Sequence, residues 1–198
     1  MYSAKVITRN LSRASEYLRK RYDLSRGWEL RLSTPGEIED MRSYLNKILD
    51  DKGVPTRQLS REEALWCLAQ QTICKNDFRY FSSNYGKIEG WDARVVYFTP
   101  NVAQEMFLGE MSHAEELGWA QMWQMLKARQ LGFTTLWQML LAHRAFLFKN
   151  VKAITGSAAE EKSRAMVQKL AFIWDQMDWW LRPTRTQYEA GKLLTFGE

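Results

Sequence analysis

The sequence predicts an α/β protein in which a helical N-terminal region is followed by a core of alternating strands and helices. Two observations support this fold class. Helix-capping signals followed by apolar residues at helical spacing occupy the front of the chain, and from residue 121 onward strand and helix patterns alternate. A β-α-β-α order implies a parallel sheet with a right-handed crossover. We expect residues 1–60 to form the helical region and residues 61–198 to form the first part of the α/β core.

Two capping boxes mark helix starts in the front part of the chain. Thr34-Pro35-Gly36-Glu37 combines a capping residue, a proline at the first helical position and a glutamate three residues after the cap. Apolar residues then recur at helical spacing up to Leu49, and Gly53-Val54-Pro55 ends the pattern. Ser60-Arg61-Glu62-Glu63 is the second box, and it predicts a short amphipathic helix after residue 60.

The remaining elements follow from β-propensity, caps and periodicity. Arg94 to Phe98 is β-prone, and Asn101 opens a helix that Gly118 ends. The predicted core then consists of a strand, a helix, a strand and a helix over residues 121–128, 134–148, 151–155 and 157–178. Tyr188 to Phe196 is interpreted as a β-hairpin or an edge strand that turns near Ala190-Gly191. We expect the acidic and aromatic residues 175–180 to close the preceding helix, and the methionines at 106, 111, 122 and 125 to lie in the core.

The composition is that of a folded, basic protein. The chain has 198 residues, of which 45% are hydrophobic and 13% aromatic, and its formal net charge is +5. Positive charge gathers near the N-terminus, in Lys5, Arg9, Arg13, Arg19, Lys20, Arg21, Arg26 and Arg31. Either a solvated basic helix or a surface for DNA or another negatively charged partner accounts for this bias.

Cysteine usage and hydropathy indicate in which cellular compartment the protein is expected. Cys67 and Cys74 lie seven residues apart, with no second cysteine pair, so we expect reduced thiols in the cytoplasm rather than a zinc site. No apolar run reaches the length of a membrane span, and the polar start of the chain differs from a signal peptide. No membrane association is therefore expected.

The stretch from Leu126 to Leu136 is the strongest candidate for a ligand site. An apolar strand, a loop with one glycine, Gly132, and the hydroxyls of Thr134 and Thr135 precede a helix start. A joint of this kind directs backbone N–H groups and the positive end of a helix at one point, which suits a triphosphate. The standard phosphate-binding loop has a lysine just before the hydroxyl, where this chain has Phe133. An ordinary β–α turn capped by Thr134 is the alternative.

The loop resembles a known motif. Lys127-Ala128-Arg129-Gln130-Leu131-Gly132-Phe133-Thr134-Thr135 is similar to the deviant Walker A motif of large terminase subunits, the ATP-driven motors that package DNA in tailed phages and prophages. Asn76 to Phe81 followed by Asn84-Tyr85 resembles the aromatic helix that precedes the ATPase core in that family. Pro100 to Gln104 resembles its adenine-reading Q motif, and Val151 to Thr155 its second core strand. The resemblance covers roughly residues 74–198.

The resemblance implies roles for individual residues. Lys127 would neutralise the β- and γ-phosphates of ATP, and Arg129 would sense or contact a phosphate. Gln130, Gly132 and Thr135 belong to the stretch that offers backbone N–H groups, and Thr134 would contact Mg²⁺ held by ATP. Gln104 is the candidate adenine reader, although Asn101 and Gln104 also match a helix capping box, and both interpretations stay open.

The resemblance also implies a fold, a function and partners. It implies the start of a P-loop NTPase core of the ASCE type, within a motor that moves double-stranded DNA into procapsids in the host cytoplasm. The partners would be other copies in a ring, the portal protein and the small terminase subunit. No catalytic residue is identified, because Ala171 to Asp175, the one match to an acidic Walker B strand, lies in a helical pattern. We therefore expect an N-terminal piece of a longer protein that hydrolyses little ATP alone.

Two other functions fit the sequence. In the first, the chain is a non-enzymatic module whose basic front binds DNA or a protein and whose loop is a structural turn. In the second, it is a helicase-like ATPase of related core topology, which the displaced lysine disfavours.

Overall fold

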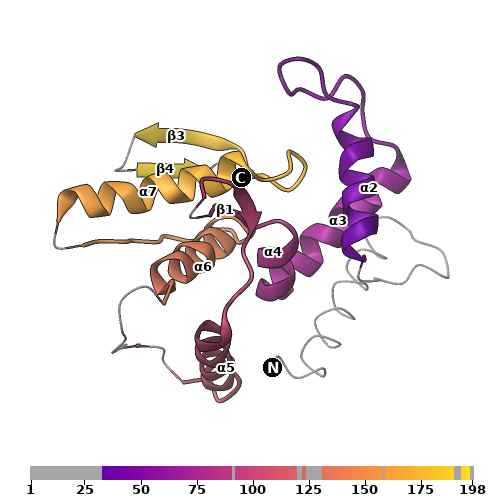
Figure 1. Cartoon of the computed structure of the whole chain (residues 1–198). Helices are drawn as coiled ribbons and strands as arrows, with labels where there is room; N and C mark the ends of the chain where they lie inside the picture. The colour runs from indigo at the N-terminus through magenta and orange to yellow at the C-terminus, as the bar shows by residue number, and fades with distance from the viewer. Residues whose placement is uncertain are drawn as a thin grey trace.

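The computed structural model describes residues 33–90, 92–119, 122–123, 131–157, 159–189 and 193–196. These ranges contain six helices and two small antiparallel sheets, so the protein is mixed α/β. Figure 1 shows α7 and the β3–β4 hairpin on one side of the molecule and α2 with α3 on the other, with α4 and α6 between them. The β3–β4 hairpin therefore lies at one margin of a helical centre.

Capped helices occupy the front of the described chain, as the sequence predicts. Helix α2 spans Pro35–Asn46, and both hydrogen bonds of its predicted capping box are present between Thr34 and Glu37. Helix α3 spans Arg61–Asn76 and begins with the second predicted box, between Ser60 and Glu63. Asp77 then caps α4, Phe78–Asn84, by accepting a hydrogen bond from the Tyr80 N–H at 2.9 Å. Each start is fixed by a local side chain that satisfies backbone N–H groups.

A short hairpin and a helix follow. Strands β1, Lys87–Glu89, and β2, Val95–Tyr97, pair antiparallel, and β2 confirms the strand predicted for this stretch. Helix α5, Val102–Glu116, starts at the predicted Asn101 cap. It ends just before Gly118, whose φ of 69° belongs to the left-handed region that glycine adopts without strain.

The C-terminal half holds two long helices and a hairpin. Helix α6 spans Phe133–Leu147, helix α7 spans Glu160–Asp175, and both match the predicted helices closely. Strands β3, Arg185–Glu189, and β4, Leu193–Phe196, form the predicted C-terminal hairpin. The hairpin covers the helices through Phe196, whose ring lies 4.9 Å from Phe146 and 6.5 Å from Trp174, measured between centroids.

The hydrophobic core lies where α3, α4, α6 and α7 meet. Leu136, Met139 and Ala142 on α6 are fully buried. Helix α4 approaches α6 so closely that a Cβ on Gly86, just after α4, would lie 2.6 Å from Met139 Sδ. The absence of a side chain at Gly86 is therefore a condition of this packing.

The parallel sheet predicted for the core is not present in the described residues. All strand pairings there are antiparallel, and residues 151–155, predicted as a strand, have no regular structure. Ile154 is 95% exposed and Val151 is 39% exposed, so this β-prone run has no neighbouring strand or core to pack against. Strand propensity depends on such packing, which explains the wrong prediction. The predicted strand 121–128 lies mostly outside the described residues, and residues 122–123 are not in a strand.

The methionine prediction was wrong in part as well. Met106 is 70% exposed and Met122 is 95% exposed, whereas both were expected in the core. Met106 lies on the outer face of α5, where no described element covers it. Met125 lies outside the described residues. The prediction that Ala171 to Asp175 is helical rather than a Walker B strand is confirmed, since these residues end α7.

Candidate functional site

The loop that opens α6 has the geometry of an uncapped helix start. Gly132 occupies the N-cap position with φ 69°, and no side chain caps the helix there. The Thr134 side chain is exposed in the first turn, and Thr135 beside it is half-buried. Thr134 does not serve as the cap that the ordinary-turn alternative requires. The first-turn N–H groups and the positive helix end therefore favour a negative group at this position.

Three of the seven predicted site residues lie outside the described residues. These are Lys127, Arg129 and Gln130. Their proposed phosphate contacts stay predictions. The described part of the candidate site consists of Gly132, Thr134, Thr135 and Gln104.

Gln104 is brought directly against this loop. Its Nε2 donates a hydrogen bond to the Leu131 carbonyl oxygen at 3.3 Å, and Asn101 Nδ2 donates to the same oxygen at 3.2 Å. A Cβ on Gly132 would lie only 2.8 Å from Gln104 Nε2. The first turn of α5 and the start of α6, far apart in sequence, thus form one contact.

The same amide is committed to helix capping. Gln104 Oε1 accepts a hydrogen bond from the Asn101 N–H at 2.9 Å, which completes the capping box, and the residue is 2% exposed. Both ends of the amide are used, so the described conformation shows the capping role that the sequence also predicts. Reading adenine would require the amide to turn away from these partners.

A buried ion pair that the sequence did not reveal lies elsewhere in the molecule. Arg42 Nε on α2 donates to both carboxylate oxygens of Asp178, at 2.8 and 2.9 Å. The guanidinium also donates to Glu39, to Tyr97 Oη at 2.7 Å and to the Asn84 carbonyl oxygen at 2.9 Å. Because Arg42 and Asp178 are 136 residues apart, no local pattern announces the pair.

Burial and charge oppose each other in this pair. Burial raises the pKa of Asp178, and Arg42 counteracts part of that effect. Burial is the largest single influence on Arg42 and acts to lower its pKa, but the charge and hydrogen bond of Asp178, together with Tyr97 and Glu39, outweigh it, so that the Arg42 pKa is raised. We regard the pair as structural, because each of the three guanidinium nitrogens donates to a protein acceptor and the pair joins α2 to the segment after α7.

The cysteine and histidine side chains do not form a ligand set. Cys67 and Cys74 are both buried free thiols on α3, and burial raises the pKa of Cys67 to about 12. His143 Nε2 donates to the Cys74 carbonyl oxygen at 2.7 Å, and burial lowers the pKa of His143 to about 4. Within the described ranges, no group of three or more His, Cys, Asp or Glu side chains is placed to hold a metal ion.

Among the helices that the structure describes, none has both the length and the hydropathy needed to cross a bilayer. No protein-family model matches the sequence, and no curated protein matches it.

Proposed function

We propose that this chain is the N-terminal part of a viral DNA-packaging motor ATPase, a large terminase subunit, that binds ATP and Mg²⁺ through the loop before α6. The observation that carries the proposal is the contact between Gln104 and that loop. The resemblance names residues 100–104 and 127–135 as two parts of one nucleotide site, and Asn101 and Gln104 of the first contact Leu131 in the described part of the second.

The start of α6 supports the same proposal. Its first-turn N–H groups have no side-chain cap, and the Thr134 hydroxyl is exposed beside them. A phosphate group is stabilised at such a helix end by hydrogen bonds and by the helix dipole. Lys127 would add the positive charge that a triphosphate needs.

The proposed motor would act on double-stranded DNA, as a ring of copies on a portal protein supplied by a small terminase subunit. Phosphate contacts would dominate its grip on DNA, so salt would weaken that grip. We expect negligible ATP hydrolysis by the 198-residue chain, because Asp175, the closest match to a Walker B acid, ends a helix instead of a strand.

Calorimetry with ATP and Mg²⁺ tests the proposal. The wild-type chain is expected to bind ATP with a dissociation constant on the order of micromolar, and Lys127→Ala should abolish binding without lowering the melting temperature. Lys152→Ala is the matched control, because Lys152 is an exposed lysine in the segment after α6 and should leave binding unchanged. Equal binding by both variants would refute the assigned role of Lys127.

A second candidate function rests on exposed apolar side chains. Four large apolar side chains are at least 64% exposed: Val102 (80%), Met106 (70%), Trp119 (64%) and Met122 (95%). Val102 and Met106 lie four residues apart on α5 and so share one face of it, and exposed apolar side chains that share a face are typical of a protein-binding surface. If neither the wild type nor Lys152→Ala binds ATP, the non-enzymatic interaction module becomes the better explanation.

A further inference from the structure

The groove between α2 and α3 combines an apolar floor with an acidic rim. Its volume is about 850 Å³. Met41, Leu65, Trp66 and Ala69 supply apolar surface, and the carboxylates of Asp40 and Glu62 lie along it. Two further lining carboxylates are already held by the fold, Glu37 by the Thr34 capping box and Glu63 by the Ser60 capping box and Arg57. Such a surface fits a segment that is apolar on one face and positively charged beside it.

Residues 1–32 have this chemistry. They contain eight Lys and Arg against three Asp and Glu, and this difference equals the whole formal net charge of +5. Small and large apolar residues recur at helical spacing, in the order Ala4, Ile7, Leu11, Ala14, Leu18 and Tyr22. On a helix, Arg19 and Arg21 would flank this apolar stripe on its two sides.

Chain connectivity favours the same occupant. The described chain begins at Ser33, and Ser33 itself lines the groove. A segment that ends at the groove is present there at a high effective concentration, so docking costs it less entropy than it would cost a separate partner. We propose that residues 1–32 of the same chain dock in the α2–α3 groove, with the apolar stripe on the floor and the basic side chains at the carboxylate rim.

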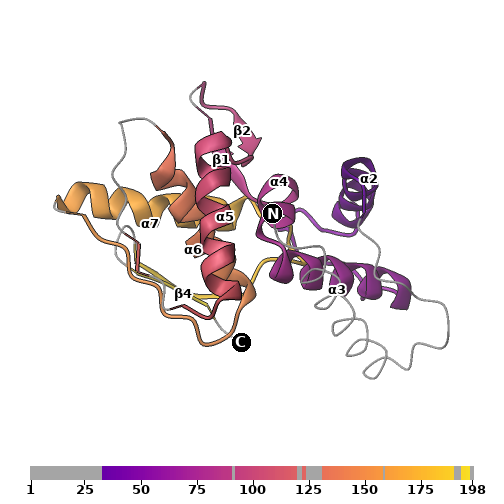
Figure 2. The ribbon, with the colours of Figure 1, turned by 90° about the horizontal axis from the view of Figure 1, so that it is seen from below.

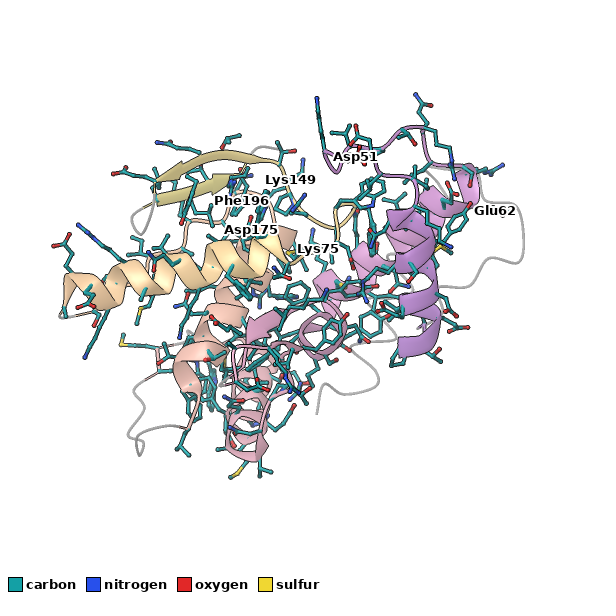
Figure 3. The ribbon with its side chains drawn as sticks, turned by 45° about the horizontal axis from the view of Figure 1, so that its top comes forward. Asp51, Glu62, Lys75, Lys149, Asp175 and Phe196 are labelled. Carbon is teal, nitrogen blue, oxygen red and sulfur yellow. The ribbon has the colours of Figure 1, made fainter. Side chains whose placement is uncertain are left out.

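Docking of this kind would fix where the excess positive charge lies. Figure 3 shows Glu62 at the α2–α3 end of the molecule, away from Asp175 and Phe196 at the hairpin end. The basic segment would thus be held at the α2–α3 end, and its charge would be partly neutralised by Asp40 and Glu62. The inference does not depend on the proposed ATPase function, since none of these residues belongs to the candidate nucleotide site.

Carbodiimide cross-linking of the full chain tests the placement directly. The reagent joins a lysine amine and a carboxylate in contact through an amide bond, so Lys5 or Lys20 should become linked to Asp40 or Glu62. A mixture of ¹⁴N- and ¹⁵N-labelled chains distinguishes links within one chain from links between two. Same-chain links that persist over a roughly fiftyfold dilution support the proposal. Links between differently labelled chains would overturn it in favour of a second copy in the groove.

Hydrogen exchange of the full chain provides the second measurement. The amides of residues 4–22 should exchange at least about tenfold faster in the double variant Asp40→Lys/Glu62→Lys than in the wild type. The matched control is Asp51→Lys/Glu116→Lys, which makes the same charge change at exposed positions outside the groove. Equal exchange in the two double variants, or the absence of any cross-link in the wild type, would overturn the proposal.

Discussion

Arg42 on α2 and Asp178, two residues beyond the C-cap of α7, form a buried ion pair in which both side chains are 8% exposed. Arg42 Nε lies 2.8 Å from Asp178 Oδ1, and the ring centroids of Tyr85 and Tyr97 each lie 5.6 Å from the guanidinium carbon. The pair therefore joins the first described helix to the C-terminal part of the core, in surroundings that screen charge poorly.

Removing one partner of this pair should destabilise the protein strongly. Asp178→Ala leaves the Arg42 cation buried without its main counter-charge, which costs about 3 kcal/mol. The free energy of unfolding, measured by urea titration followed by tryptophan fluorescence, is expected to fall by that amount. Arg94→Ala is the control, because the Arg94–Asp92 pair is exposed and contributes less than about 0.5 kcal/mol. Equal losses in the two variants would contradict the structural role assigned to Asp178.

The close approach of α4 to α6 predicts a second effect. In Gly86→Ala the added Cβ would meet Met139 Sδ at 2.6 Å, Met139 Cε at 2.9 Å and the Ser82 Cα at 3.0 Å. Because Met139 is fully buried, relief of its contacts requires α4 and α6 to move apart. Relief of the contact with Ser82 Cα requires the backbone at the end of α4 to shift as well. We expect a loss of about 1–3 kcal/mol in unfolding free energy.

Gly109→Ala serves as the control, because it is expected to raise the unfolding free energy instead of lowering it. Gly109 lies within α5, and a Cβ there has no heavy atom within 4 Å. Alanine in a helix is favoured over glycine by about 1 kcal/mol, so this variant should be more stable than the wild type. A stabilised Gly86→Ala would show that α4 and α6 are packed less tightly than the 2.6 Å approach to Met139 Sδ requires.

The local features of the fold were predictable from the sequence, and the long-range ones were not. The caps at Thr34, Ser60 and Asn101 each depend on residues within four positions of one another, and the structure has all three. The Arg42–Asp178 pair depends on the packing of distant elements. No spacing rule predicts which two distant residues will pair, although a buried charge that has no local partner needs a distant one.

In the candidate site, too, the local features were predictable from the sequence and the contacts between distant elements were not. The helix start at Gly132 follows from local sequence, and so does the capping of α5 by Asn101 and Gln104. The contact between Gln104 and the Leu131 carbonyl depends on how α5 and α6 pack. The predicted strand 151–155 failed for a related reason, because apolar β-branched residues form a strand only where another strand or a core covers them.

Stability in acid should depend on Glu63. Hydrogen bonds from Arg57, at 2.7 and 2.9 Å, are the main cause that lowers the pKa of Glu63 from 4.5 to about 2. A carboxylate with a lowered folded-state pKa stabilises the protein above pH 4.5, and this contribution is lost as the pH falls toward 2. The stability advantage of the wild type over Glu63→Gln should therefore shrink across this window, as measured by urea titrations at successive pH values. A constant advantage would contradict this account.

His143 should titrate far below the ordinary range of histidine. Burial lowers its pKa from 6.5 to about 4, while the Nε2–H remains bonded to the Cys74 carbonyl oxygen. Since the unfolded chain takes up this proton more readily, protonation destabilises the fold as the pH falls below 6.5. An NMR titration of the ring signals should show an imidazole with a midpoint near 4, and that signal should be missing in His143→Asn. A midpoint near 6.5 for His143 would show that the ring is accessible to water.

Gly132 offers the sharpest test of how α5 and the candidate loop are joined. Alanine at this position meets two penalties, the positive φ of 69° and a Cβ 2.8 Å from Gln104 Nε2. Gly118 has the same φ of 69° with no heavy atom within 4 Å of the Cβ position, so Gly118→Ala measures the backbone penalty alone, about 1–2 kcal/mol. Gly132→Ala should therefore lose more unfolding free energy than Gly118→Ala. The excess should disappear in the Gln104→Ala background, because the shorter side chain no longer reaches the loop. If the two glycine variants lose the same free energy, Gln104 does not press against the start of α6, and the structural link between the two halves of the candidate site is absent.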